Sequence, residues 1–445
     1  MNILLANSSC KIGGVSTFLL SLRAELLARG HRCSMFFFEH GPMESHLPRD
    51  AQAHFGDLAD CLKLLADEAI DVVHANNVDW PTGISAVRRA GAKLVLTAHK
   101  VREPAWTYGW HAGNCDAFVT VSSWIRDELQ PFTDVPIQVV HNGIDTSRFT
   151  TAARQRRSPP IVAWIGRGSA PRKRLERFAA IAPALKQAGL EIWVIDQHGS
   201  EPFARQHPEA ARQLLSASDV WRGAGFDEMP GIYQTIAASG GCIVSTASME
   251  GLPLALLEAQ ACGVVVVAAD VQGVRECVSP SHGGVLYPAD AAAADAIGVV
   301  LRTVTDQRAV AERQTQAATH VRDSFSLRAM TDRYLGLYES TAAVQPDTGA
   351  RRRHSVLFDW GGYVEERLGV GYAQYEASRL LRNAGRQTLA RAAADEGAVT
   401  APTMYLHPRR LAHLIRQHLT RSDGPPSGRS RLDSAGYRES RSRGM

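Results

Sequence analysis

Residues 161–178 have the sequence IVAWIGRGSAPRKRLERF, in which an apolar run is followed by a basic turn and then by a helical pattern. The alternation continues through further apolar runs: EIWVID (191–196), CIVSTA (242–247), VVVVAAD (264–270) and VLYP (285–288). Near-continuous apolar strands separated by helices are typical of a parallel sheet that is covered on both faces. This stretch predicts a Rossmann-like, doubly wound α/β domain over residues 160–325.

The first part of the chain has the same rhythm. Apolar runs alternate with helical patterns: NILLA (2–6), CSMFFF (33–38), DVVHA (71–75), KLVLTA (93–98), AFVTV (117–121) and IQVV (137–140). The segment TTAARQRRSPP (150–160) then has the charged, small and proline residues of a linker. We therefore expect another Rossmann-like domain over residues 1–150, with a ligand cleft where the strands of both domains end.

The composition of the 445 residues, with 45% hydrophobic and 21% charged residues, is that of a folded globular protein. The seven cysteines include no Cys-x-x-Cys pair, so we expect reduced core residues. The N-terminal residues MNILLANSSCK have no basic leader, and no apolar run approaches the ~18 residues of a membrane span. These features predict a cytoplasmic protein, at most peripheral at the inner face of a membrane.

The most specific motif is EGLPLALLEAQACG at residues 250–263, in which Glu250 and Glu258 flank an apolar stretch. Pro253 favours a helix that begins just after Glu250. The amides at that helix start would then face an anion such as a diphosphate: Leu252, Leu254 and Ala255. An amphipathic helix with solvated glutamates is the alternative, but it does not explain the Gly-Leu-Pro loop.

A pair of cations follows the strand at residues 161–166. Arg167 and Lys173 lie at a strand-to-helix turn, where they can bracket a diphosphate, Arg by its planar fork and Lys as a point charge. Such cations would neutralise a phosphate leaving group. The alternative is a basic turn that is merely solvated.

Weaker signals come from the first domain. Gly13 and Gly14 lie between the first strand and the first helix, where glycines allow close approach of the backbone to a phosphate or sugar, or only a tight turn. His99 ends the strand at residues 93–98 and would face the cleft, although a lone histidine is as often structural.

Taken together, these segments resemble glycosyltransferase family 4, the retaining GT-B enzymes, over roughly residues 1–342. The spacing of Glu250 and Glu258 matches the family's Glu-x7-Glu signature. VVHNGIDTSRF (139–149) and GVREC (273–277) are similar to further family segments. Residues 326–342 look like the family's helix that crosses back to the first domain. By the same resemblance, the first domain would bind the acceptor, and residues 160–325 would bind the nucleotide sugar.

The resemblance implies roles for the residues that match the family motifs. It makes His99 and Glu250 catalytic, and it assigns the donor to a larger set: Gly13, Gly14, Arg167, Lys173, Leu252, Pro253, Leu254 and Glu258. The sequence departs from the family at IDQHGS (195–200) and over residues 223–241, where the donor's base and ribose normally rest.

The implied function is transfer of a hexose-type sugar from a nucleotide diphosphate donor to a glycan or lipid-linked acceptor, with retention. The chain has no Asp-x-Asp motif, so we expect no metal and no cofactor beyond the donor substrate. The alternatives are a nucleotide-sugar epimerase with the GT-B fold and a non-catalytic binding subunit.

Residues 351–445 hold 17 Arg, no Lys and 9 acidic residues, a balance of +8. We expect an extra helical segment over residues 354–421 and a disordered tail over residues 422–445. One use for this charge is contact with an anionic membrane surface. The absence of a stacking aromatic pattern argues against nucleic acid as the partner.

Overall fold

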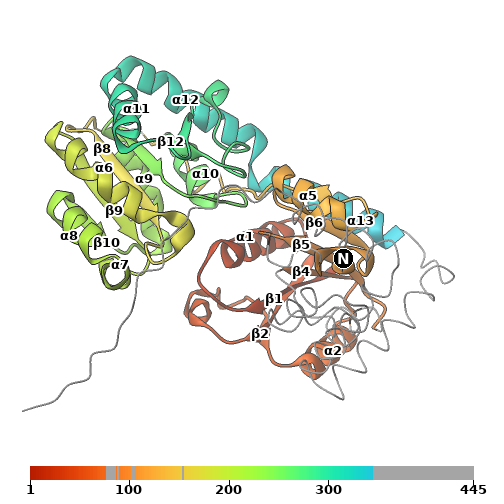
Figure 1. Ribbon diagram of the computed structural model, residues 1–445. Helices are drawn as coiled ribbons and strands as arrows, with labels where there is room; N and C mark the ends of the chain where they lie inside the picture. The colour runs from red at the N-terminus through yellow and green to blue at the C-terminus, as the bar shows by residue number, and fades with distance from the viewer. Residues whose placement is uncertain (77–86, 88–89, 102–106, 153–154, 344–445) are drawn as a thin grey trace, which may run out of the picture.

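The computed structural model describes residues 1–76, 87, 90–101, 107–152 and 155–343. Within these ranges the chain forms two lobes, each built on one parallel sheet with helices on its faces (Figure 1). This arrangement confirms the predicted fold of two doubly wound α/β domains. The predictions for residues 354–421 and 422–445, and for a membrane contact through residues 351–445, lie outside the described residues.

The first lobe has a seven-stranded sheet of order β3-β2-β1-β4-β5-β6-β7. Strand order reverses between β1 and β4, and such a reversal opens a crevice at the carboxyl ends of the strands. The strands are β1 Asn2–Ser9, β2 Arg32–Glu39, β3 Ala53–Phe55, β4 Val72–Asn76, β5 Lys93–Ala98, β6 Ala117–Thr120 and β7 Gln138–Val139. The helices described in this lobe are α1 Gly14–Ala28, α2 Leu58–Asp67, α4 Thr107–Gly113 and α5 Ser123–Leu129, with 3-10 turns η1 Pro42–His46 and η2 Gln130–Phe132.

The second lobe has a six-stranded parallel sheet of order β10-β9-β8-β11-β12-β13, with its reversal between β8 and β11. The strands are β8 Ile161–Gly166, β9 Glu191–Asp196, β10 Val220–Arg222, β11 Cys242–Ser245, β12 Val265–Asp270 and β13 Val285–Pro288. The helices are α6 Leu175–Gln187, α7 Ser200–Gln206, α8 Pro208–Ala217, α9 Met229–Ala238, α10 Leu254–Ala261, α11 Ala293–Thr305 and α12 Gln307–Ser324, with 3-10 turns η3 Pro171–Lys173, η4 Phe226–Glu228 and η5 Pro280–His282.

The predicted linker at residues 150–160 lies between the two sheets in the chain, because β7 ends at Val139 and β8 begins at Ile161. The exact domain boundaries stay a prediction. All seven cysteines are free, and all but Cys115 are buried, as expected of core thiols. Across the described residues, no helix combines the length and the apolar character needed to cross a membrane.

The chain returns to the first lobe through α13, Leu327–Ala343 (Figure 1). A bridge at Ile144 and Ser326 begins the return, since the Ile144 amide donates to the Phe325 carbonyl over 2.7 Å. Tyr334 and Tyr338 of α13 are then fully buried in the core of the first lobe. The helix therefore ties the second lobe to the first by packing.

Candidate active site between the two lobes

The loop between β11 and α10 lies against the first lobe. A side chain at Gly251 would place its Cβ 2.4 Å from the His99 carbonyl oxygen, and a Cβ at Gly14 would lie 3.5 Å from Leu254 Cδ1. Glycine at position 251 therefore permits the close approach of the two lobes. The contacts bring together the predicted residues of both lobes: Gly14 and His99 from the first, and Gly251 and Leu254 from the second.

Helix α10 begins at Leu254, with Pro253 in the preceding N-cap position rather than in the first helical turn. Its first turn contains no acidic residue, so the positive end of the helix dipole is not offset by a carboxylate there. Leu252, one of the residues predicted to face the donor, is buried. Gly273, with a φ of 75°, packs against the same loop. A Cβ at this position would lie 2.1 Å from the Glu250 carbonyl oxygen, so the contact requires glycine.

Glu250 and Lys173 form an ion pair in which Nζ lies 2.5 Å from Oε1. Only 8% of the Glu250 side chain is exposed, so the carboxylate is largely withdrawn from water. Turn η3, which carries Lys173, is fixed to the β11 loop because the Ser248 amide donates to the Arg172 carbonyl over 2.8 Å. The structure thus brings the predicted site residues Lys173 and Glu250 into direct contact.

Arg167 follows β8, and its turn is held by Asp196 at the end of β9. The Gly168 amide donates to Asp196 Oδ1 over 3.0 Å, and Oδ2 of this buried carboxyl has no hydrogen-bond partner among the described residues. Burial raises the pKa of Asp196, although the amides of Gly168 and His198 act in the opposite direction. Burial and the positive charge of Arg172 lower the pKa of Arg167, while the Glu250 carboxylate raises it, so these charges lie close together.

His99 is partly buried, and its ring Nε2 lies 2.8 Å from Asn76 Oδ1. Asn76 Nδ2 in turn donates to the His74 carbonyl, so Oδ1 is the acceptor and His99 carries its proton on Nε2. Burial lowers the pKa of His99 to about 3, so the imidazole is neutral at pH 7. Its Nδ1 is then a hydrogen-bond acceptor rather than a cation.

A second layer of polar side chains lies near His99. His74 Nδ1 lies 2.7 Å from the Tyr338 hydroxyl, and its Nε2 lies 2.8 Å from the Thr97 hydroxyl. Phe18 contacts the rings of both His74 and His99. Through these contacts α13 supports the strand end that carries His99.

Glu258 is buried in α10 and accepts a hydrogen bond from the Tyr233 hydroxyl of α9 over 3.0 Å. Burial raises its pKa to about 7, against the opposing effects of the Tyr233 hydrogen bond and the charge of Arg148. Its contact with the donor stays a prediction.

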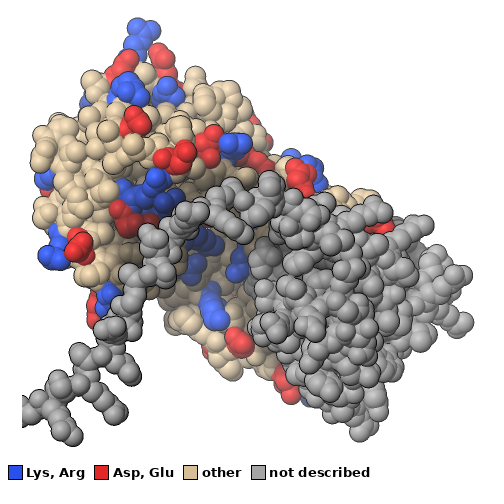
Figure 2. Space-filling view, in the orientation of Figure 1, with Lys and Arg blue, Asp and Glu red and all other residues tan. Residues whose placement is uncertain are grey.

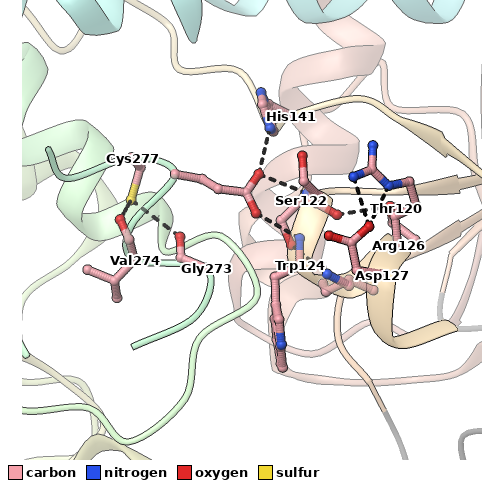
Figure 3. A network of polar contacts seen from close by, with 12 residues as sticks. Thr120, Ser122, Trp124, Arg126, Asp127, His141, Gly273, Val274 and Cys277 are labelled. Carbon is pink, nitrogen blue, oxygen red and sulfur yellow. Dashed lines mark hydrogen bonds and ion pairs between the residues drawn. The ribbon is translucent and has the colours of Figure 1, made fainter. Parts of the chain in front are cut away.

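A further carboxylate, which no sequence motif predicts as a site residue, joins the lobes (Figure 3). Glu276 of the second lobe accepts from the amides of Ser123 and Trp124, over 2.8 and 2.9 Å, at the start of α5 in the first lobe. It also lies 3.0 Å from His141 Nε2. Burial alone would raise the pKa of Glu276, but these hydrogen bonds outweigh it and the pKa is lowered.

Sequence reasoning missed Asn76, Asp196 and Glu276 because their partners lie far along the chain. The only signal for Glu276 is its place in the family-like segment GVREC. Figure 2 shows Lys and Arg side chains gathered in the hollow near the middle of the molecule. The described cations of the site are Lys100, Arg167, Arg172 and Lys173.

The two family models that match this chain both describe glycosyltransferases. Residues 12–148 match the family model described as Glycosyltransferase Family 4, and residues 159–303 match Glycosyl transferases group 1. Glycogen synthase of Mycobacterium tuberculosis is 26% identical over 281 residues, which are 56% of this chain and 63% of that protein. The chain therefore spans less than two thirds of the length of that relative.

Other relatives are matched over more of their length. Phosphatidyl-myo-inositol mannosyltransferase of Mycobacterium tuberculosis is 23% identical over 363 residues, 74% of this chain and 94% of that protein. Sucrose-phosphate synthase from Thermosynechococcus elongatus superposes with a TM-score of 0.63 at 17% identity, covering 78% of this chain and all of that one. Alr3699/HepE of Anabaena, solved with UDP-glucose, gives 0.62 at 16% identity over 76% of this chain and all of that one.

Proposed function

We propose that this chain, which belongs to the GT-B glycosyltransferases of family 4, transfers a hexose-type sugar from a nucleotide diphosphate to a glycan or lipid-linked acceptor. The proposal includes retention of anomeric configuration and no requirement for a metal ion. This proposal rests on the ion pair between Lys173 and Glu250. The pair lies beside Arg167 and next to the strand end that bears His99.

The donor's diphosphate would lie against Arg167, Lys173 and the start of α10. Arginine and lysine both stabilise phosphate oxygens, and the amides near Leu252 and Leu254 add the positive end of the helix dipole. These groups would offset the negative charge that develops on the leaving phosphate as the sugar–phosphate bond breaks. A Cβ at Gly14 would make only ordinary contact with Leu254 Cδ1, and a Cβ at Gly13 would meet nothing within 4 Å, so the donor's phosphate or sugar would have room beside Gly13.

Glu250 and His99 would act at the sugar. The Glu250 carboxylate can accept from a sugar hydroxyl and stabilise the positive charge of an oxocarbenium-like transition state. Neutral His99 can accept a hydrogen bond at Nδ1 while Asn76 holds the ring in place. In a retaining reaction of this kind the acceptor hydroxyl would attack the anomeric carbon on the face that the phosphate leaves. The departing phosphate would take the hydroxyl proton, so no nucleophile from the protein is required.

Glu258 would hold the ribose of the donor, as the family resemblance implies. The Tyr233 hydroxyl occupies one of its oxygens, and the rest of the carboxylate would be available to hydroxyl groups. Uridine diphosphate is the first nucleotide to test, because Alr3699/HepE was solved with UDP and with UDP-glucose.

A screen of nucleotide sugars that carry a radiolabel in the sugar tests this function. We expect at least one donor to release or transfer its label, and we expect the release to be lost in Glu250→Gln. Label that stays on the nucleotide but changes its sugar isomer would support the epimerase alternative instead. Binding of nucleotide without any turnover, across all donors and with membrane and glycan acceptors, would support the non-catalytic alternative.

A further inference from the structure

Two cations of the cleft have no part in the proposed handling of the donor. Lys100 follows His99 directly after β5, and Arg172 lies in η3 beside Lys173. Both side chains are exposed, and they come from different lobes. Both positions lie next to the loop between β11 and α10, because a Cβ at Gly251 would lie 2.4 Å from the carbonyl oxygen of His99, which precedes Lys100, and the Ser248 amide donates to the Arg172 carbonyl. Partial shielding from water lowers the pKa of Lys100, and the positive charges of Arg172 and Arg167 lower it further.

Counter-charges for these cations are few among the described residues. Within the part of the chain that the structure describes, no carboxylate pairs with Lys100, Arg167 or Arg172, whereas Lys173 is held by Glu250. Like charges held together destabilise the folded protein unless an anion joins them. The donor's diphosphate would engage Arg167 and Lys173, which leaves Lys100 and Arg172 without a counter-charge from the described residues.

The backbone at both positions is fixed although the side chains are exposed. The Arg172 carbonyl accepts from the Ser248 amide over 2.8 Å, and the Lys100 carbonyl accepts from the Tyr108 hydroxyl over 2.9 Å. The two cations therefore extend from fixed backbone positions that both lie next to the loop between β11 and α10. A ligand that touches both would bridge the lobes next to the centre of transfer.

We propose that Lys100 and Arg172 form an anion subsite that binds a phosphate group on the acceptor. This deepens the proposed function and rests on it. A phosphate monoester carries about −1.5 to −2 charges at pH 7, which suits two cations better than a single carboxylate does. Arginine supplies a planar fork for two phosphate oxygens and lysine supplies a point charge. The phosphate belongs either to a soluble sugar phosphate or to a lipid headgroup.

Calorimetric titration of inorganic phosphate into the full-length protein, saturated with UDP, tests the subsite. We expect phosphate to bind the UDP complex of the wild type, and we expect Lys100→Ala and Arg172→Ala each to weaken it by about tenfold. The affinity for UDP itself should change less than about threefold in both variants. Arg172→Lys, which keeps the charge, should retain most of the phosphate affinity.

Matched controls are Lys63→Ala on α2 and Arg212→Ala on α8, which remove exposed cations outside the cleft. Competition by glucose 6-phosphate and by vesicles that contain phosphatidic acid, whose headgroup is a phosphate monoester, then identifies the source, and either competitor supports the subsite. No phosphate binding to the UDP complex, or equal binding in Lys100→Ala and Arg172→Ala, overturns it. A large loss of UDP affinity in these two variants also overturns it, because the cations would then serve the donor. Failure of the wild type to bind any nucleotide overturns the proposed function as well.

Discussion

The Lys173 ammonium lies 2.5 Å from the Glu250 carboxylate, so the cation expected at the donor's phosphate and the carboxylate expected at its sugar are in direct contact. Removing both groups from water is costly unless they compensate each other, which explains why they are paired in a largely buried position. A donor phosphate that approaches Lys173 must share it with Glu250. The pair therefore couples binding of the diphosphate to the orientation of the carboxylate beside the sugar.

Glu250→Gln should lower kcat by about 100-fold, as expected when one preorganised charge is removed from the transition state (~3 kcal/mol). Nucleotide affinity should be unchanged or higher, because Lys173 is released from its partner. Steady-state kinetics and calorimetry on the same preparation check both effects. Unchanged kcat with weaker binding would make Glu250 a ground-state contact.

Glu258→Gln should change how the thermal midpoint depends on pH. The pKa of Glu258 is about 7 in the folded protein against an ordinary value of 4.5, so its protonated form stabilises the fold below pH 4.5. That contribution is lost as the pH rises from 4.5 to about 7, and it should not be lost in the glutamine variant. The midpoint of Glu258→Gln relative to wild type should therefore rise over this range. Exposed Glu128→Gln serves as the control, and parallel pH curves for Glu258→Gln and wild type would contradict the prediction.

Glu276→Gln should destabilise the contact between the lobes at neutral pH by about 1.5–3 kcal/mol, the usual value for hydrogen bonds to a charged group. The pKa of Glu276 is lower than its ordinary 4.5, so the stabilisation is complete above pH 4.5 and is lost as the pH falls through the folded value. Thermal midpoints of wild type and variant should accordingly converge at acidic pH. The comparison variant is Glu312→Gln, which removes only an exposed pair with Arg308. A difference in midpoint that persists undiminished at pH 3 would contradict the prediction.

Excess EDTA should leave turnover largely intact, because the charge on the leaving group would be offset by Arg167, Lys173 and helix amides. The measurement uses the nucleotide sugar that the radiolabel screen identifies. Loss of turnover in EDTA that Mg²⁺ or Mn²⁺ restores would show that a cation shares this task.

The sheet cores could be predicted because strands such as β8 and β12 are largely buried and are apolar almost throughout. Two strands were missed, β3 Ala53–Phe55 and β10 Val220–Arg222, since each has only three residues at a sheet edge. Local sequence cannot show that such short segments pair.

For the candidate site, the sequence identified residues that sit in recognisable loops, such as Arg167, Lys173 and Glu250. It did not identify Asn76, which orients His99, or Tyr233, which binds Glu258, because these contacts join residues distant in the chain. The raised pKa of Glu258 depends on burial between α9 and α10, which local sequence does not encode.

The donor site at Arg167 and Lys173 can be tested by calorimetric titration of UDP into the double variant Arg167→Ala/Lys173→Ala. We expect wild type to bind UDP and the double variant to bind it about 100-fold more weakly or not at all, since two charge-assisted contacts are lost. A double variant Lys63→Ala/Arg212→Ala, which removes two exposed cations outside the cleft, should bind like wild type. Undiminished affinity in Arg167→Ala/Lys173→Ala would contradict a donor site between the lobes at these residues.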